Sequence, residues 1–262
     1  MASTEPRKIV SLSVVIPAYN EARRIPSYLQ SVATYLAGRG FAYEILVVDD
    51  GSSDETAALI EQAATKNPCL RLLRLSHNSG KGAAVRAGMQ AAQGALQLFA
   101  DADGATPIQE LERLEAAMNN GADLAIGSRT LASRDSRYRV QARLHRTLLG
   151  NLFNRIVRRL GIRDIHDTQC GFKLFRQSVA QDLFSVARID GYGFDLELLY
   201  VAQQRGYRVA EVPINWADQP GSKVRVLRDG LAMLREMLAI RQNDARGFYA
   251  PQRSILGAAR RS

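Results

Sequence analysis

Short apolar runs recur along the first half of the chain, and each is followed by a polar or glycine-containing segment. The runs are Leu12–Ile16, Ile45–Val48, Leu70–Leu75, Ala95–Ala100 and Leu124–Ile126. Short apolar runs of this kind are typical of parallel strands that are buried on both faces. The pattern therefore predicts five strands, with polar residues at several of their carboxyl ends.

The segments between these runs have the spacing of amphipathic helices. The first begins at Pro26, and its apolar positions are Leu29, Val32, Ala33 and Leu36. Ser52 and Glu55 have the spacing of a capping box before the second helix. Further helices are expected after the HNSGKG loop (residues 77–82) and from Pro107. This alternation predicts an α/β fold with a doubly wound, mostly parallel sheet flanked by helices.

The second half of the chain is less regular. A strand is expected over Tyr207–Ile214, followed by a final amphipathic helix. The apolar positions of that helix are Leu227, Leu231, Leu234 and Leu238. The basic segment from Arg246 onward is expected to be a disordered tail.

A stripe of large apolar residues at a spacing near four predicts another helix between Leu144 and Leu160, with arginines along its borders. A wide apolar face with basic borders is typical of a helix that lies in a membrane interface next to anionic lipid. The same pattern fits a helix that packs in the core and turns its arginines to water. The sequence leaves both interpretations open.

The length of 262 residues suits one large α/β domain. We expect this domain to span residues 1–245, with residues 246–262 as the tail. No signal peptide and no run of 18 apolar residues is present, so no bilayer-spanning segment is expected. Cys69 and Cys170 are too few for a disulfide framework or a zinc site, which favours a reducing compartment.

The net charge of +9 is concentrated, because ten arginines lie between Arg129 and Arg163. A positive field of this kind attracts phosphate groups, which occur on nucleic acids, membrane lipids and nucleotides. Charge alone does not choose among these partners.

Two acidic residues, Asp101 and Asp103, directly follow the fourth apolar run. Residues beyond the carboxyl end of a parallel strand face the ligand crevice of an α/β protein. Two carboxylates separated by the small Ala102 can share one hard cation such as Mg²⁺ or Mn²⁺, which also binds substrate phosphates. This pattern suits a nucleotide-diphosphate donor, although an acidic loop that caps the next helix would look the same.

An ordered set of motifs then carries a family resemblance. The motifs VVIPAYNE, VVDDGSSD, NSGKG, DADG and GSR resemble those of the inverting family 2 glycosyltransferases, which have a GT-A fold. Within that family, DADGAT, DTQCGFKLF, FDLELL and the late SKV are similar to the group that glucosylates dolichyl phosphate. The mannose-transferring relatives usually have a run nearer TSGFR than the TQCGFK of this chain.

The resemblance implies roles for individual residues, with a nucleotide-sugar half over about 10–130 and an acceptor half over about 131–245. The implied nucleotide-sugar site consists of Pro17, Tyr19, Glu21, Asp49, Asp50, Gly80, Lys81, Asp101, Ala102 and Asp103. Gly80, Lys81 and Gly82 would let the backbone approach the donor, with Lys81 as a point charge for it. The implied catalytic residues are Asp101, Asp103, Arg129 and Lys223, with Asp101 and Asp103 as metal ligands. The acceptor or sugar side would include Gln169, Phe172, Asp195, Glu197 and Arg225.

The implied reaction is attack by a polyprenyl phosphate oxygen on the anomeric carbon of UDP-glucose, with Mg²⁺ or Mn²⁺ neutralising the departing diphosphate. A phosphate monoester has its second pKa at about 6, so the attacking oxygen is anionic without a strong general base. Asp195 and Glu197 would orient sugar hydroxyls or a cationic side chain rather than act as a base. Alternatives within the family are GDP-mannose or another UDP-sugar as donor, or a non-lipid acceptor.

A more distant alternative is a non-enzymatic protein that binds phosphate or nucleic acid through the arginine-rich segment. That function predicts stacking aromatic residues in the basic run, where only Tyr138 and Phe153 occur. It also leaves the acids after the strands unexplained, so nucleic acid is not expected as a partner.

A lipid acceptor predicts a location as well. Related eukaryotic enzymes usually carry an amino-terminal membrane anchor, whereas here only the segment MASTEPRKIV stands before the first expected strand region. We therefore expect a cytoplasmic protein that associates peripherally with the anionic cytoplasmic face of a membrane. The Leu144–Leu160 and Leu227–Leu238 segments are the expected contacts.

Overall fold

The computed structural model describes residues 10–141, 162, 164–219 and 226–250. Its strands are β1 (Leu12–Ala18), β2 (Tyr43–Asp49), β3 (Leu70–Arg74), β4 (Leu96–Ala100), β5 (Leu124–Ser128), β6 (Val140–Gln141), β7 (Phe172–Arg176), β8 (Val209–Pro213) and β9 (Trp216–Ala217). Its helices are α1 (Ile25–Ala37), α2 (Thr56–Lys66), α3 (Lys81–Ala91), the 3₁₀ helix η1 (Ile108–Glu110), α4 (Leu111–Asn119), α5 (Arg129–Ala132), α7 (Gln177–Val186), α8 (Phe194–Gln204) and α9 (Val226–Ala245). The five strands predicted in the first half are confirmed as β1 to β5, and the later predicted strand is confirmed as β8.

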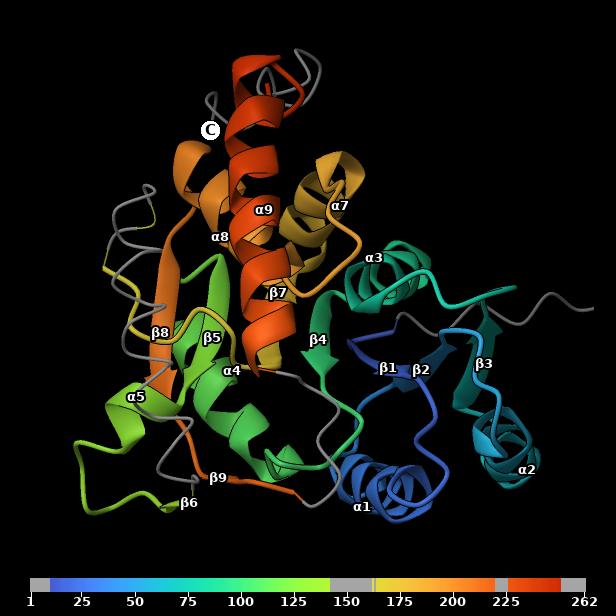
Figure 1. Ribbon diagram of the computed structural model, residues 1–262. Helices are drawn as coiled ribbons and strands as arrows, with labels where there is room; N and C mark the ends of the chain where they lie inside the picture. Colours follow the sequence, from blue (N-terminus) through green and yellow to red (C-terminus); the bar gives the residue numbers. More distant parts are fainter. Residues whose placement is uncertain (1–9, 142–161, 163, 220–225, 251–262) are drawn as a thin grey trace, which may run out of the picture.

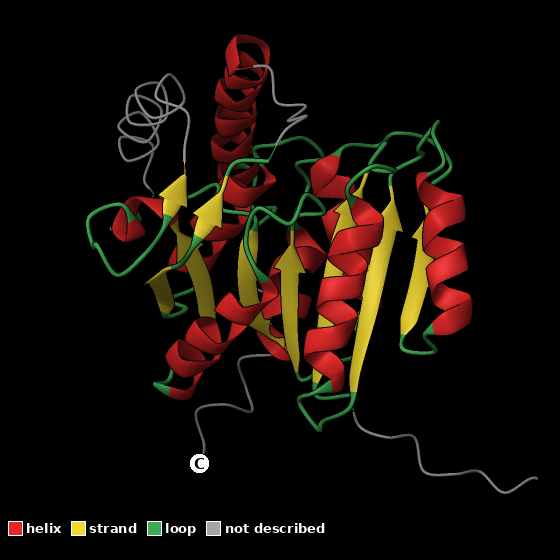
Figure 2. Cartoon of the chain, turned by 90° about the horizontal axis from the view of Figure 1, so that it is seen from below, coloured by secondary structure: helices red, strands yellow, loops and turns green. Residues whose placement is uncertain are grey.

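In the described part of the chain, the main sheet has seven strands in the order β3-β2-β1-β4-β7-β5-β8 (Figure 2). Neighbouring strands are parallel except around β7, which runs antiparallel to both β4 and β5. The prediction of a mostly parallel sheet is confirmed. The position of β7 was not predicted, because its residues entered the sequence analysis only as part of the motif DTQCGFKLF.

Helices cover both faces of this sheet (Figure 1). One face carries α3, α7, α8 and α9, and the other carries α1, α2 and α4. Side chains alternate between the faces along each strand, so Val15 packs in the first layer while Val14 and Ile16 pack in the second. The apolar runs of the sequence are buried on both sides for this reason.

The direction of the strands decides where the site lies. The carboxyl ends of β1, β2, β4 and β5 meet at one edge of the sheet, because these strands are parallel. Since β7 runs the opposite way, its first residue, Phe172, pairs with Ala100 at the carboxyl end of β4. Segments from both halves of the chain therefore meet at this edge.

The capping box expected at Ser52 and Glu55 is wrong. Glu55 precedes α2 without a side-chain capping bond, and the Ser52 hydroxyl accepts a hydrogen bond from the Asn20 N–H at 2.9 Å. The Thr56 hydroxyl likewise accepts from the Glu21 N–H at 2.7 Å. These hydroxyls join the loop after β1 to the loop after β2, since both loops lie at the same edge.

The final helix is present, and of the expected apolar positions Leu234 packs against the core whereas Leu238 does not. Met233, Met237 and Ile240 are buried, while Leu238 is 59% exposed. Packing against the cluster that contains α8 decides which side of the helix is buried. The side chains of Leu227 and Leu231 lie outside the described residues.

The tail expected from Arg246 is wrong for residues 246–250. Tyr249 is buried, its ring packs edge-on to Tyr200 of α8, and its hydroxyl donates to the Glu197 carboxylate at 2.6 Å. The folded domain therefore extends at least to residue 250. The predicted Leu144–Leu160 helix, Lys223, Arg225 and residues 251–262 lie outside the described residues.

Replacing the buried Tyr249 should destabilise the domain. Tyr249→Ala is expected to lower the free energy of unfolding by about 3 kcal/mol or more, because it removes a buried ring and a donor to Glu197. Phe248→Ala is the matched control, since Phe248 is 39% exposed and its ring centre lies 3.9 Å from the Arg188 guanidinium carbon. Its expected cost is about 1 kcal/mol. Urea unfolding measures both, and equal small losses would contradict the burial of Tyr249.

Candidate active site

Two open carboxylates lie at the carboxyl end of β4. The Asp101 N–H donates to the Gly171 carbonyl at 2.9 Å, and Asp101 Oδ1 contacts Lys81 Nζ at 2.7 Å. Asp103 Oδ1 accepts a hydrogen bond from the Ala105 N–H at 3.0 Å. The side chains of Asp101 and Asp103 are 33% and 29% exposed, so both can reach a ligand.

This pair fits a divalent cation. Carboxylate oxygens are the hard ligands that Mg²⁺ and Mn²⁺ prefer. Burial raises the pKa of Asp103, and the neighbouring charge of Asp101 raises it further, so a cation would relieve their repulsion. Nowhere in the described ranges do three or more His, Cys, Asp and Glu side chains form a metal-binding group. The two aspartates therefore suit an ion whose other ligands come from a diphosphate and water.

Lys81 supplies a fixed positive charge beside these acids. It is the first residue of α3, and its Nζ lies 5.5 Å from the centre of the Phe99 ring and 6.0 Å from that of Tyr192. Burial lowers the pKa of Lys81, but the charges of Asp101 and Asp195 outweigh it and raise the pKa above its ordinary value. Lys81 is therefore an ammonium at neutral pH.

The NSGKG loop is held by the protein itself. Asp50 accepts hydrogen bonds from the Ser79 N–H at 2.7 Å and the Gly80 N–H at 3.0 Å. Gly80 has a φ of +103°, and a Cβ there would lie 2.4 Å from the Asp190 carbonyl oxygen. The close approach of the Asp190 backbone therefore requires a glycine at this position, and the approach of the loop backbone to a donor stays a prediction.

Of the two acids at the carboxyl end of β2, Asp49 has one carboxylate oxygen without a hydrogen bond from the described residues. Its side chain is fully buried, and its Oδ1 accepts from the Ser52 N–H at 3.2 Å. Its Oδ2 lies 3.6 Å from Arg74 Nε but accepts no hydrogen bond from the residues that the structure describes. The choice between Asp49 and Asp50 that the sequence left open stays open, because the spare oxygen of Asp49 belongs to a fully buried side chain.

The motif after β1 contributes a second ion pair. Pro17 is buried within β1, and Tyr19 beyond it is 37% exposed. The Glu21 carboxylate accepts two hydrogen bonds of 2.6 Å from Arg24, whose Nη1 lies 3.9 Å from Asp103 Oδ2. Glu21 therefore orients Arg24 beside the acidic pair, an arrangement that the sequence did not predict.

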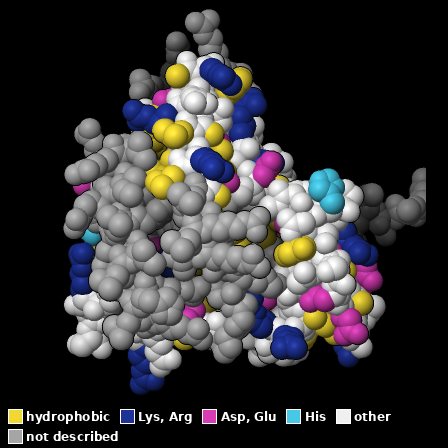
Figure 3. Space-filling view, in the orientation of Figure 1, with side chains coloured by type: hydrophobic (Ala, Val, Ile, Leu, Met, Phe, Trp, Pro, Cys, Tyr) yellow, Lys and Arg dark blue, Asp and Glu magenta, His cyan; other side chains and the backbone are white. Residues whose placement is uncertain are grey.

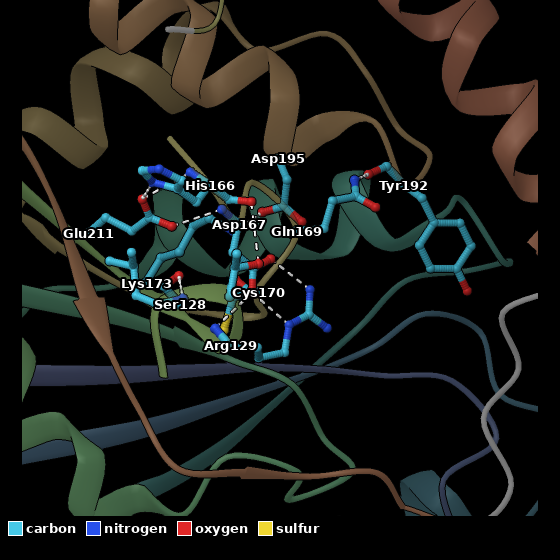
Figure 4. A network of polar contacts seen from close by, with 12 residues as sticks. Ser128, Arg129, His166, Asp167, Gln169, Cys170, Lys173, Tyr192, Asp195 and Glu211 are labelled. Carbon is cyan, nitrogen blue, oxygen red and sulfur yellow. Dashed lines mark hydrogen bonds and ion pairs between the residues drawn. The ribbon is translucent and has the colours of Figure 1, made fainter. Parts of the chain in front are cut away.

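Arg129 is fixed by a network of polar contacts on the other side of the crevice (Figure 4). Its backbone N–H, Nε and Nη2 donate to Asp167 at 2.9, 2.7 and 2.7 Å. Burial alone would raise the pKa of Asp167, but the Arg129 guanidinium holds it below its ordinary value. Glu211 of β8 in turn accepts from the backbone N–H groups of His166 and Asp167 at 2.9 and 2.8 Å. The edge strand thus sets the orientation of Arg129.

A second network surrounds Asp195 (Figure 4). Lys173 Nζ donates to Asp195 Oδ1 at 2.5 Å and to the Cys170 carbonyl at 2.6 Å. Gln169 Nε2 donates to the Tyr192 carbonyl at 3.3 Å. Cys170 packs as a small apolar residue, and burial raises the pKa of its thiol to about 12.

Two residues assigned to the acceptor or sugar side do not face the crevice. Phe172 is fully buried in the apolar cluster on the α1 and α4 side of the sheet. Glu197 is also fully buried, and it accepts hydrogen bonds from the Arg188 and Ile189 N–H groups and from Tyr249. Both assignments are wrong for the described structure. Ala102 is nearly buried between the two metal-ligand candidates.

Sequence reasoning missed Gly171, which lies against Asp101. A Cβ at this position would come within 2.0 Å of Asp101 Oδ2. The glycine between Cys170 and Phe172 was the available signal, because a glycine within a strand-like run often marks a close approach.

Comparison with known proteins identifies the family of this chain. The family model described as "Glycosyl transferase family 2" matches residues 13–184. The chain belongs to this family. The dolichyl-phosphate beta-glucosyltransferase of Homo sapiens is 39% identical over 243 residues, which cover 88% of this chain and 74% of the human protein. The Saccharomyces cerevisiae protein of the same name is 35% identical over 256 residues, or 92% and 77% of the two chains.

Solved structures confirm the predicted GT-A type of fold for this family 2 protein. Glucosyl-3-phosphoglycerate synthase from Mycobacterium tuberculosis, crystallised with UDP, aligns with a TM-score of 0.66 at 21% identity, over 94% of this chain and 82% of that one. The same synthase with Mn²⁺, UDP and phosphoglyceric acid gives 0.64 at 22% identity, over 94% and 80%. At such identities the likeness establishes the fold alone.

The contact between Gly171 and Asp101 predicts a sensitive position in this family 2 enzyme. Gly171→Ala is expected to lower glycosyltransferase activity about 100-fold, because the added methyl displaces the Asp101 carboxylate. Gly38→Ala is the matched control, since a Cβ at Gly38 meets nothing closer than 3.5 Å. Activity assays with circular dichroism as a check of folding measure both. Full activity of Gly171→Ala would contradict this packing.

Proposed function

We propose that this family 2 enzyme transfers glucose from UDP-glucose to a polyprenyl phosphate of the dolichyl type, with Mg²⁺ or Mn²⁺ at Asp101 and Asp103. The names of the curated relatives support the acceptor and the sugar. A fold neighbour crystallised with Mn²⁺ and UDP-glucose supports the nucleotide and the ion.

The observation that carries this proposal is that residues suited to bind a nucleotide sugar lie at one edge of the sheet. Asp49 offers a buried carboxylate oxygen, which can accept a base N–H or a ribose hydroxyl. Asp101 and Asp103 offer hard oxygen ligands, and Lys81 adds an ammonium beside them. These three kinds of contact suit the base, the ribose and the diphosphate of a nucleotide.

The proposed acceptor explains why the site needs no strong base. The phosphate oxygen of a monoester is anionic near neutral pH, since its second pKa is about 6. The residues of the site therefore have to hold two anionic substrates with the attacking phosphate oxygen aligned to the anomeric carbon. When bound, the divalent cation supplies positive charge for the departing diphosphate, and Asp101 and Asp103 are the residues that hold it.

Arg129 is the described cation best placed for the second anion. Two of its three guanidinium nitrogens are fixed by Asp167, and its Cζ lies 5.4 Å from the centre of the Trp216 ring. A guanidinium with its orientation set in this way can bind phosphate through its remaining N–H groups at little further entropic cost. Lys223 and Arg225 stay proposals on motif resemblance alone.

A lipid acceptor also calls for membrane contact, and we propose peripheral association with an anionic cytoplasmic membrane face. Figure 3 shows hydrophobic and basic side chains together on α9. Leu238 is 59% exposed there, and Arg235 and Arg241 are exposed on the same helix. Among the described helices, none combines the length and apolar character needed to cross a bilayer. The free cysteines suit the reducing side of such a membrane.

The decisive assay combines the purified chain with Mn²⁺ or Mg²⁺, a short polyprenyl phosphate and a panel of UDP-glucose, GDP-mannose and UDP-N-acetylglucosamine. We expect transfer from UDP-glucose, and a loss of at least about 100-fold in Asp103→Asn, because a ligand of the charge-neutralising ion is weakened. Glu61→Gln on the exposed part of α2 is the control and should keep full activity. Transfer from GDP-mannose alone would refute the proposed donor.

Membrane association is tested by sedimentation with vesicles of phosphatidylcholine and phosphatidylserine. Binding should be strong at low salt and weaken in about 1 M NaCl, where screening acts beyond about 3 Å. Leu238→Asp should reduce binding, whereas Gln62→Asp on the opposite sheet face adds the same charge and should not. Absence of binding, or equal loss in both variants, would refute the α9 contact.

A further inference from the structure

Lys173 occupies a position where a charge is costly. It lies in β7, between Phe99 of β4 and Ile126 of β5, and its side chain is fully buried. An ammonium inside a sheet must recover its lost hydration from close partners. An apolar residue of similar size could fill the same space without that cost. The presence of lysine here therefore requires an explanation beyond packing.

The ammonium has close partners on the site side of the sheet (Figure 4). Its Nζ donates to Asp195 Oδ1 at 2.5 Å and to the Cys170 carbonyl at 2.6 Å. Asp195 lies in the first turn of α8 and is 3% exposed. Lys173 of β7 thus fixes the carboxylate of Asp195, which belongs to α8.

Asp195 links this pair to the candidate metal ligands. Its carboxylate interacts electrostatically with the Lys81 ammonium as well as with Lys173. Lys81 is in contact with Asp101 at 2.7 Å. Positive and negative charges therefore alternate from the centre of the sheet to the acidic pair, in the order Lys173, Asp195, Lys81 and Asp101.

We infer that Lys173 is a positioning residue of this active site, which acts through Asp195. From inside the sheet it fixes the place of the Asp195 carboxylate, and Asp195 shares the attraction of Lys81 with Asp101. Without Lys173, the Asp195 carboxylate would keep the attraction of Lys81 among the described cations and would draw it from Asp101. The inference rests on the proposed transfer reaction for its kinetic part, while the coupling of the two residues does not.

The test is a double-mutant cycle in the full chain with Lys173→Met, Asp195→Asn and both changes together. Methionine matches the length of lysine without the charge, and asparagine matches the shape of aspartate. Lys173→Met should lower kcat about 30-fold and change the donor KM less than about 3-fold, because it disturbs the alignment of groups rather than the binding of the donor. In the Asp195→Asn background, the same change should alter kcat less than about 3-fold.

Thermal unfolding of the same four proteins provides a readout that is independent of activity. The double variant should melt above Lys173→Met, because it leaves no buried carboxylate without a partner. A cycle without this coupling, or a Lys173→Met protein that folds and keeps its kcat, would overturn the inference. So would an equal loss of kcat in both backgrounds, since it would show that Lys173 acts by packing.

If Lys173→Met alone does not fold, the double variant compared with Asp195→Asn decides. Equal kcat values support the inference, and a much lower kcat in the double variant refutes it. A wild-type chain that transfers no sugar would refute the proposed function, whereas the unfolding cycle would still test the coupling of Lys173 to Asp195.

Discussion

The hydrogen bond from the Asp101 N–H to the Gly171 carbonyl joins the two parts of the site. It continues the pairing of β4 with β7 by one residue, at the edge where the parallel strands end. Gly171 allows this approach because a side chain there would occupy the space of the Asp101 carboxylate. This junction places the loop that carries Asp167 and Gln169, and the strand that carries Lys173, beside the acidic pair.

The charges at the site are arranged as neighbouring pairs. Lys81 contacts Asp101, Arg129 contacts Asp167, and Lys173 contacts Asp195. Each pair offsets part of the desolvation that either charge would suffer alone. Asp103 differs, since the cation that contacts it among the described residues, Arg24, lies 3.9 Å away and is held by Glu21. A cation that arrives with a diphosphate would therefore find its least compensated ligand at Asp103.

The sequence sufficed for the parts of the fold that depend on local pattern. Apolar runs gave β1 to β5, and the residues directly after β4 gave the acidic pair. Strand β7 could not be found in this way, because a lysine that is buried by an ion pair looks like a surface residue in the sequence.

The direction in which individual side chains point could not be predicted from the local sequence pattern either. Asp195 and Glu197 are two residues apart in α8, and packing sends one to Lys173 and the other to Tyr249. Gly80 is required by the backbone of Asp190, which is far away in the sequence. Such contacts become visible only when the chain is folded.

Strand β7 also has a consequence for how the chain is made. It lies between β4 and β5 but is synthesised after both, so these two strands cannot be joined into one sheet until residues 172–176 have left the ribosome. Until then, one edge of β4 has no partner strand, and unpaired edges favour aggregation. The same short segment joins β4 to β5 and carries Lys173, so the sheet and this part of the site form together, before Asp195 and Glu211 follow later in the chain.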